Sequence, residues 1–291
     1  MVFSDVCCIL TPPLFVDIAC FTDDGSDMLS GEILDIKTGP RTKLPDMNVA
    51  RSFYPSAVAI RRGAGHRIYM FGGGDYGADL IDSCEFLDVG DDQWTLLEAK
   101  MTTPRACACA VLLDHTTIVI CGGSACGAAA GGVSSCESLD LNTHTFSSFP
   151  DMLVPRFGHA GVLYSGTVVV IGGGQKEKTC EQFDPAVFKW TPFAPISEER
   201  GGCVDAAVVN GMIYALVSYD KSVRVYDGAA WTTVTHVPRS FVAPPVVAFG
   251  GKFIVIPAHK TDADVFDPAT NSWSSLPAMI PRGYYHSAIS F

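Results

Sequence analysis

A repeat is the feature that most constrains the fold of this chain. The glycine clusters FGGG (71–74), CGG (121–123) and IGGG (171–174) recur about every fifty residues, a period typical of repeat proteins. An arginine and an apolar run precede each cluster. A cysteine–glutamate pair, an aspartate and a large aromatic residue follow it. Such a period predicts units that cannot fold alone and that stack on their neighbours.

The same unit extends in both directions. A fifth copy runs from Arg200 to Trp231 and a sixth from Arg239 to Trp273, while a weaker first copy contains LFVDIACF and GEILD. Each unit holds four short strands rich in β-branched and aromatic residues, separated by Gly, Asp-Pro and Asn turns. We call them strands a to d: a follows the arginine, b ends in the glycines, c ends in aspartate and d carries tryptophan.

Four-stranded units at this spacing are typical of β-propeller blades. The glycine pair, the aromatic residue and aspartate that end strand c, and the tryptophan of strand d resemble the kelch-repeat family over nearly the whole chain. The resemblance implies one all-β domain, residues 1–291: a six-bladed kelch β-propeller with four antiparallel strands per blade. The expected blades are residues 14–47 plus 284–291, 48–101, 102–152, 153–196, 197–237 and 238–281.

The two ends of the chain are expected to close the ring. The first copy lacks a strand a, and the tail from Tyr284 to Phe291 can supply it by pairing with the strand from Leu14 to Phe21. That pairing would remove the open sheet edges. Residues 5–10 could fill the same slot, but we favour the tail because Arg282 precedes it, as an arginine precedes every other strand a.

The c-strand cysteines raise the question of metal binding or redox chemistry. Cys84, Cys136 and Cys180 lie four residues before the c-strand aspartate, a position that Gly31, Val223 and Ala263 occupy in the other copies. A free cysteine packs like a small hydrophobic residue. A position repeated around a ring also cannot gather at one metal, whose bonds to sulfur are about 2.3 Å. We therefore expect core residues, no metal and no other cofactor; the tryptophans are likewise expected to pack between blades.

Composition argues against some functional classes, including nucleic-acid binding and membrane insertion. The 291 residues are 48% hydrophobic and 18% charged, with a formal net charge of −11. This balance argues against a nucleic-acid partner, because phosphate neutralisation requires Lys and Arg. The N-terminus lacks the basic region of a signal peptide, and no apolar stretch reaches the roughly twenty residues of a membrane span. The eleven cysteines, an odd number, predict free thiols and a cytoplasmic location.

The arginines that precede strand a are the candidate site. Because the strands alternate in direction, these arginines share one rim with the d–a connections and b–c loops. The kelch resemblance implies that this face binds an acidic segment of another protein, through guanidinium forks that match carboxylates. The expected partner-binding residues are Arg51, Arg105, Arg156, Arg200, Arg239 and Arg282, with Tyr76 and Tyr219. Alternatively, the arginines pair at the blade junctions with Glu32, Glu85, Glu137, Glu181 and Asp264.

The expected function is a non-enzymatic interaction scaffold, with no nucleic-acid or membrane partner. In the family, a second domain often links the bound protein to a ubiquitin ligase or to actin, so the chain either acts alone or is a piece of a longer product.

Two enzyme alternatives stay open on fold analogy. Sugar epimerases of the sialate mutarotase type use an acid and an arginine near the channel, but no such pair stands out here. Copper radical oxidases resemble this chain at PRGYYHS (281–287), where Tyr284, Tyr285 and His286 occur, with His159 elsewhere. No second histidine lies beside His286, and a buried structural histidine is commoner than a ligand.

Overall fold

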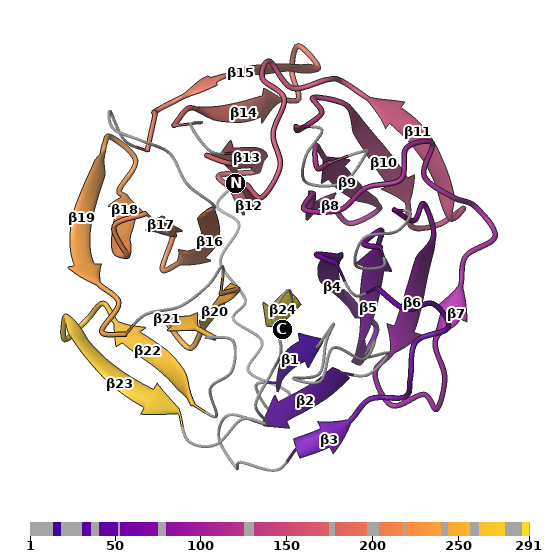
Figure 1. The fold of residues 1–291 in the computed structure, drawn as a ribbon, viewed down its shortest axis with the longest axis horizontal. Coiled ribbons are helices and arrows are strands. Elements are labelled where there is room, and N and C mark those ends of the chain that lie inside the picture. The colour runs from indigo at the N-terminus through magenta and orange to yellow at the C-terminus, as the bar shows by residue number, and fades with distance from the viewer. Residues whose placement is uncertain are drawn as a thin grey trace, which may run out of the picture.

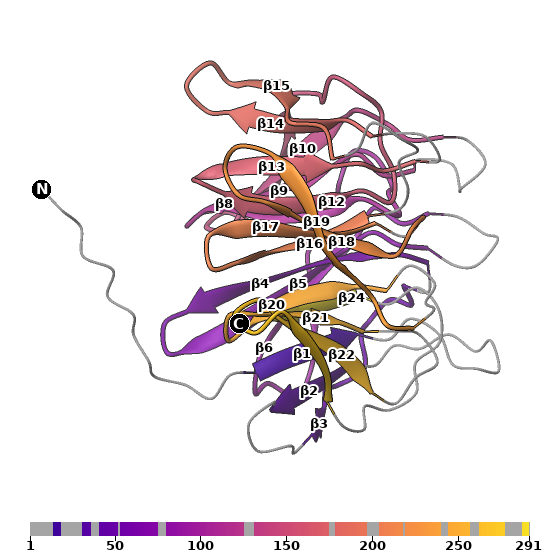
Figure 2. The same ribbon diagram turned by 90° about the vertical axis from the view of Figure 1, so that its left-hand side faces the viewer.

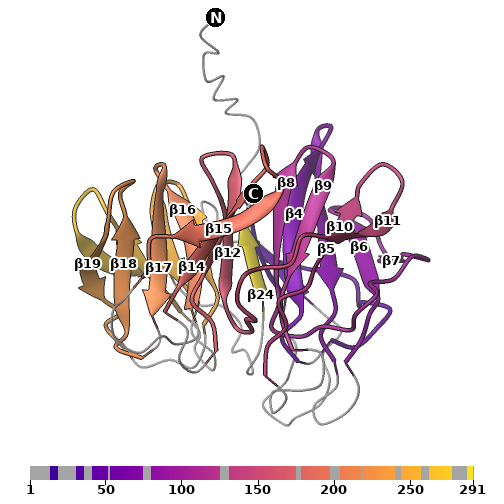
Figure 3. The same ribbon diagram turned by 90° about the horizontal axis from the view of Figure 1, so that it is seen from above.

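A computed structural model of the chain shows an all-β propeller whose sheets surround a central channel axis (Figure 1). The structure describes residues 14–18, 31–35, 41–51, 53–74, 80–124, 131–174, 178–196, 204–217, 219–239, 244–256, 262–276 and 287–290. The turned views show the sheets standing side by side, with their strands running along the axis (Figures 2 and 3). None of the described residues belongs to a helix with the length and hydropathy of a membrane span.

Six four-stranded antiparallel sheets are present among the described residues, and five of them are built from consecutive strands. The first three are β4–β7 (Ser56–Arg62, Gly65–Phe71, Cys84–Asp88, Thr95–Leu96), β8–β11 (Cys109–Asp114, Thr117–Cys121, Cys136–Asp140, Thr145–Phe149) and β12–β15 (Ala160–Tyr164, Thr167–Ile171, Cys180–Asp184, Lys189–Phe193). The next two are β16–β19 (Val204–Val209, Met212–Val217, Ser222–Tyr226, Trp231–His236) and β20–β23 (Val246–Phe249, Lys252–Val255, Ala263–Asp267, Ser272–Leu276).

The remaining sheet combines both ends of the chain. It contains β1 (Leu14–Ile18), β2 (Gly31–Asp35), β3 (Arg41–Lys43) and β24 (Ser287–Ser290), in the order β24-β1-β2-β3. Strand β24 pairs antiparallel with β1, with Val16 opposite Ile289. The tail therefore pairs with the first strand as predicted, and residues 5–10, the alternative, lie outside the described residues.

The core lies between neighbouring sheets, because each sheet is covered on both faces. Strand β9 shows the result: Ile118, Val119, Ile120 and Cys121 are all buried, without the alternation of a half-exposed strand. The hydrophobic clusters accordingly join residues of adjacent sheets.

The c-strand cysteines are core residues, as predicted. Cys84, Cys136 and Cys180 are buried cysteines that belong to three different hydrophobic clusters. Burial raises the pKa of the Cys84 thiol, so it stays neutral. Within the part of the chain that the structure describes, no group of three or more His, Cys, Asp or Glu side chains is placed to hold a metal ion.

Side chains of the innermost strands tie neighbouring sheets together around the channel. The Ser56 hydroxyl donates to the carbonyl of Ala108, the residue directly before β8 of the next sheet, 2.7 Å away. The Asp205 carboxylate accepts a hydrogen bond from the Val246 amide of the next sheet at 2.7 Å, and another from the Ala206 amide at 2.9 Å. Burial raises the pKa of Asp205 to about 7, against the opposing effect of these two amides.

This carboxyl should make the protein less stable as the pH rises. Its folded pKa of about 7 lies above the ordinary 3.8, so the folded state binds the proton more tightly. The resulting stability is fully present below pH 4 and is lost as the pH rises towards 7. Between pH 5 and pH 8 the loss should be about 2–3 kcal/mol. Urea unfolding at both pH values should show this extra loss in the wild type and not in Asp205→Asn; equal losses would contradict it.

Candidate functional site

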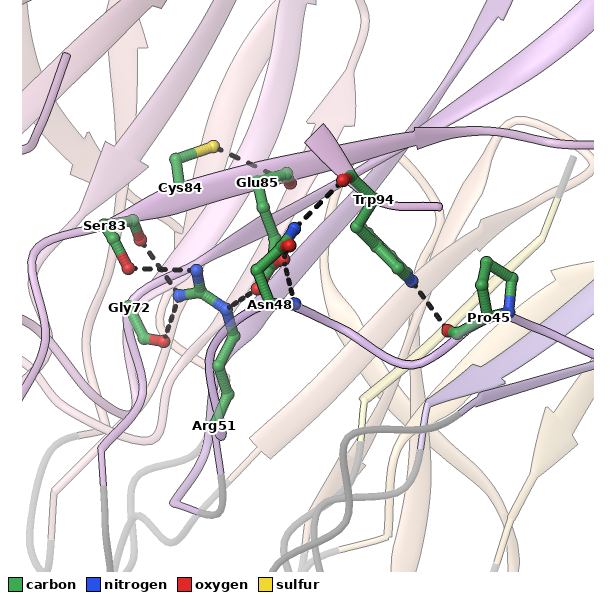
Figure 4. A network of polar contacts seen from close by, with 8 residues as sticks. All are labelled: Pro45, Asn48, Arg51, Gly72, Ser83, Cys84, Glu85 and Trp94. Atoms are coloured by element: carbon green, nitrogen blue, oxygen red, sulfur yellow. Dashed lines mark hydrogen bonds and ion pairs between the residues drawn. The ribbon is translucent and has the colours of Figure 1, made fainter. Parts of the chain in front are cut away.

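The arginine before β4 lies inside a closed polar network (Figure 4). The Arg51 Nε donates to Glu85 Oε1 at 2.9 Å. Its terminal nitrogens donate to the carbonyls of Gly72 and Ser83, at 2.7 and 2.9 Å, and to the Ser83 hydroxyl at 3.0 Å. The other Glu85 oxygen accepts from the Asn48 amide at 2.8 Å. The network therefore joins the connection before β4 to the end of β5 and the start of β6.

The next two sheets repeat this network. Arg105 contacts Glu137 at 2.9 Å and donates to the carbonyls of Gly122 and Ser135, both at 2.8 Å. Arg156 contacts Glu181 at 2.8 Å in the same way, and donates to the carbonyls of Gly172 and Thr179. The second oxygens of the two glutamates accept from the backbone amides of Thr102 and Leu153, both at 2.6 Å.

These three arginines are buried and cannot contact a partner protein. Arg51, Arg105 and Arg156 are among the largest fully buried side chains, with exposures of 0%, 1% and 0%. A buried guanidinium needs a charged partner and filled hydrogen bonds, and each arginine has both. Their geometry therefore matches the alternative interpretation, in which Glu85, Glu137 and Glu181 pair with them at the blade junctions.

The glycine pairs are explained by the arginine of the following sheet. The Gly73 amide donates to the Arg105 carbonyl, and the Gly123 amide donates to the Arg156 carbonyl, both at 2.8 Å. Gly72 has a φ of 58°, and a Cβ added there would lie 2.1 Å from the Arg105 carbonyl oxygen. Only glycine allows both this backbone conformation and this approach.

The tryptophans of strand d serve the same junctions. The indole nitrogens of Trp94, Trp190 and Trp231 donate to carbonyls of the preceding d–a connections, at 2.8–2.9 Å. Their rings therefore pack between blades, as predicted, and are not arranged to stack on a ligand.

In the β16–β19 sheet an arginine replaces the glutamate of this network. Arg224 of β18 occupies the position that Glu85, Glu137 and Glu181 hold in the other sheets. Where those glutamates accept from a backbone amide, Arg224 donates to the Ile196 carbonyl at 2.7 Å and pairs with Asp220 at 2.9 Å. The sequence reasoning missed this residue, although an arginine in the glutamate column was a visible signal.

In the β20–β23 sheet the arginine of the network is partly exposed. Arg239 contacts Asp262 at 2.9 Å and Asp264 at 2.7 Å, yet 31% of its side chain is exposed. Tyr219, in the b–c turn of the preceding sheet, is 63% exposed. The Val237 amide donates to the Lys221 carbonyl at 2.9 Å, so the connection that carries Arg239 lies against that turn. Of the other predicted site residues, Arg200, Arg282 and Tyr76 lie outside the described residues.

The enzyme alternatives rested on residues that the structure describes only in part. Tyr284, Tyr285 and His286 lie outside the described residues. His159 is 5% exposed, and neither ring nitrogen has a hydrogen-bond partner among the described residues.

Comparison with known proteins agrees with this architecture, although no protein-family model matches the chain. The chain is 26% identical over 270 residues to spermatocyte protein spe-26 of Caenorhabditis elegans, and 28% identical over 202 residues to Kelch-like protein 34 of Homo sapiens. These matches cover 84% and 68% of this chain, but only 46% and 28% of the relatives. The solved structure of YjhT superposes with a TM-score of 0.73 at 14% identity, covering 90% of this chain and 97% of that one, which shows a shared fold.

The sheets, with their arginine–glutamate junctions, define a β-propeller made of repeated four-stranded antiparallel blades. Its glycine pairs, c-strand ends and d-strand tryptophans resemble those of kelch repeats. Relatives that carry the kelch name support the same family, so the chain is a β-propeller similar to the kelch-repeat proteins.

Proposed function

We propose that this propeller is a non-enzymatic interaction module that binds a partner protein through an acidic segment. The binding surface is the exposed part of the arginine rim, by which we mean the Tyr219 turn and the Arg239 connection. The observation that carries the proposal is the contrast along this rim: three arginines are buried, whereas Tyr219 is exposed and Arg239 is partly exposed. The relatives named Kelch-like proteins support a module of this type.

The chemistry of the exposed part suits a carboxylate. Arg239 already aligns its guanidinium with two aspartates, and its exposed fraction leaves it within reach of a further acid. Burial raises the pKa of Asp264, and one of its oxygens lacks a hydrogen-bond partner among the described residues. Tyr219 adds an aromatic face with a polar end, the kind of side chain enriched in interfaces.

The non-enzymatic part of the proposal rests on how the other arginines are used. An epimerase of this architecture would need an arginine and an acid free to meet a sugar. Here Arg51, Arg105 and Arg156 are each saturated by a glutamate and by backbone carbonyls. A link to a ubiquitin-ligase component, its substrate or the actin cytoskeleton, and a cytoplasmic location, belong to the same proposal.

We further propose that the sheet shared by both chain ends acts as a sixth blade and closes the ring. The support is its strand order, which places β24 innermost, and the contacts of β24 with both β20 and β4.

A matched pair of double variants tests the binding surface. Tyr219→Ala with Arg239→Lys alters the exposed part of the arginine rim while keeping the charge. Phe188→Ala with Arg62→Lys is the control, because Phe188 lies on a turn and Arg62 ends β4, and both are exposed at the opposite ends of the strands. Tagged wild type and both variants are used for affinity capture with quantitative mass spectrometry, after melting curves show that all are folded.

We expect the rim variant to lose a captured protein at least about tenfold, since one charge-assisted contact is worth roughly 1.5–3 kcal/mol. Raised salt should weaken the wild-type complex, because screening acts on exposed charges. Retention by the rim variant together with loss in the control would reject this surface and point to the opposite rim.

A further inference from the structure

Three thiols form a row across neighbouring strands of the β8–β11 sheet. Cys109 of β8 lies opposite Cys121 of β9, which in turn lies opposite Cys136 of β10. Directly opposed residues of antiparallel strands point to the same side, with Cα atoms about 4.5–5.5 Å apart. This separation falls inside the roughly 4.4–6.8 Å that a disulfide requires. All three are free cysteines.

A buried histidine from the next sheet faces this row. His159 precedes β12, and both of its ring nitrogens lack a hydrogen-bond partner among the described residues. Two glycines make room at this seam: a Cβ on Gly122 would lie 2.8 Å from His159 Cε1, and one on Gly161 would lie 2.5 Å from Cys109 Sγ. Larger residues at either position would push the ring or the thiol out of place.

The two thiols of the first pair differ in acidity. The Cys121 thiol donates to Cys109 and lowers the pKa of the Cys109 thiol, and His159 lies close enough to lower it further, although it does not reach hydrogen-bond geometry. Burial raises the pKa of Cys121. Asp205 is also in electrostatic contact with Cys109. Cys109 is therefore the sulfur that loses its proton first.

Access favours the same sulfur. Cys109 belongs to β8, the strand of its sheet nearest the channel (Figure 1), and keeps 8% of its surface exposed. Cys121 and Cys136 lie further from the axis and are 0% and 3% exposed. Cys109 is therefore the most exposed of the three thiols.

We propose that Cys109 and Cys121 form a dithiol that hydroperoxides oxidise, with Cys109 as the attacking sulfur, Cys121 as the resolving thiol and His159 as the proton acceptor. Cys109 Sγ attacks the terminal oxygen of the hydroperoxide, the O–O bond breaks, and an alcohol or water leaves with the proton that His159 took from Cys109. Cys121 Sγ then attacks the sulfenic sulfur, the S–S bond forms, and water leaves. Two thiols lose two electrons in total, and one hydroperoxide is reduced.

Two other uses of these residues fit less well. A metal site would need at least three suitably placed ligands, and no such group exists among the described residues. A Cys–His–Asp nucleophile would need a carboxylate to orient His159. Asp205 instead holds the amides of Val246 and Ala206, and His159 has no hydrogen-bond partner in the described chain.

The test is a titration of the folded full chain with hydrogen peroxide, followed by alkylation of the remaining thiols. Digestion before Asp114 separates Cys109 from Cys121, so mass spectrometry under non-reducing conditions can identify the linked pair. We expect a Cys109–Cys121 crosslink with the loss of two alkylatable thiols per chain. In Cys121→Ala the crosslink should disappear, and dimedone should label Cys109 as a sulfenic acid.

Cys136→Ala is the matched control, because it removes the other neighbour of Cys121 and should leave the crosslink intact. His159→Gln should slow crosslinking at least tenfold, with its melting curve used to confirm the fold. The proposal is overturned if the folded wild type forms no crosslink, if Cys121 joins Cys136 instead, or if folded His159→Gln reacts at the wild-type rate.

Discussion

Replacing Arg156 with alanine is expected to lower the free energy of unfolding by about 3–5 kcal/mol, the usual result of breaking a buried ion pair from one side. Glu181 would remain in the core without the guanidinium that it contacts at 2.8 Å. The carbonyls of Gly172 and Thr179 would lose their donor as well. Chemical denaturation should show the loss as a lower midpoint with an unchanged slope.

Two variants separate the buried junction from a surface charge effect. Arg156→Lys should recover little stability, because an ammonium cannot reproduce the fork that reaches one carboxylate and two carbonyls at once. Arg239→Lys, at the exposed junction, should cost about 1 kcal/mol or less. If Arg156→Ala keeps the wild-type midpoint, the sealed junction contributes nothing to stability and the burial of this arginine needs another explanation.

Deleting residues 284–291 should abolish the cooperative unfolding of the whole ring. The deletion removes β24, which leaves β1 with an unpaired edge and uncovers the strands β20 and β4 on either side. An exposed edge and two exposed faces favour aggregation over a stable open ring. Calorimetry or thermal circular dichroism should show a broad transition at a much lower temperature, or an insoluble product.

The control for this deletion is the removal of residues 1–13, which precede β1. It should leave the melting temperature within a few degrees of the wild type, because the tail already pairs with β1. The opposite outcome, a stable tail deletion and an unfolded N-terminal deletion, would assign the closing strand to residues 5–10.

The strand pattern could be predicted from the sequence because its signals are local. Cys84, Cys136 and Cys180 share a column with small apolar residues, and that column is buried in the structure. The tail was assigned to the sheet of β1 because the first copy lacked a strand a and because Arg282 precedes the tail, as an arginine precedes every other strand a. Side-chain packing between sheets could not be read in this way, because it joins residues about fifty positions apart.

The site was harder to predict because a repeated cation looks the same in sequence whether it faces water or a glutamate. The sequence does contain the partner of these arginines, at a second repeated position: a glutamate directly follows each of Cys84, Cys136 and Cys180. Arginine and glutamate that repeat together indicate a pair, and the one copy with Arg224 in that column marks where the pair cannot form. The exposure of Arg239 depends on three-dimensional packing and has no comparable signal.

The hydrogen bonds from the Gly73 and Gly123 amides cross from one sheet to the next. At these two junctions the boundaries of the sequence repeat and of the hydrogen-bonded unit therefore differ, because each of the two blades is completed by an arginine carbonyl that precedes the next sheet. In an open solenoid the end repeats can fray because they have one neighbour. In these three blades, opening one would also break the hydrogen bonds that complete an adjacent one. We therefore expect these three blades to unfold together, as one foldon.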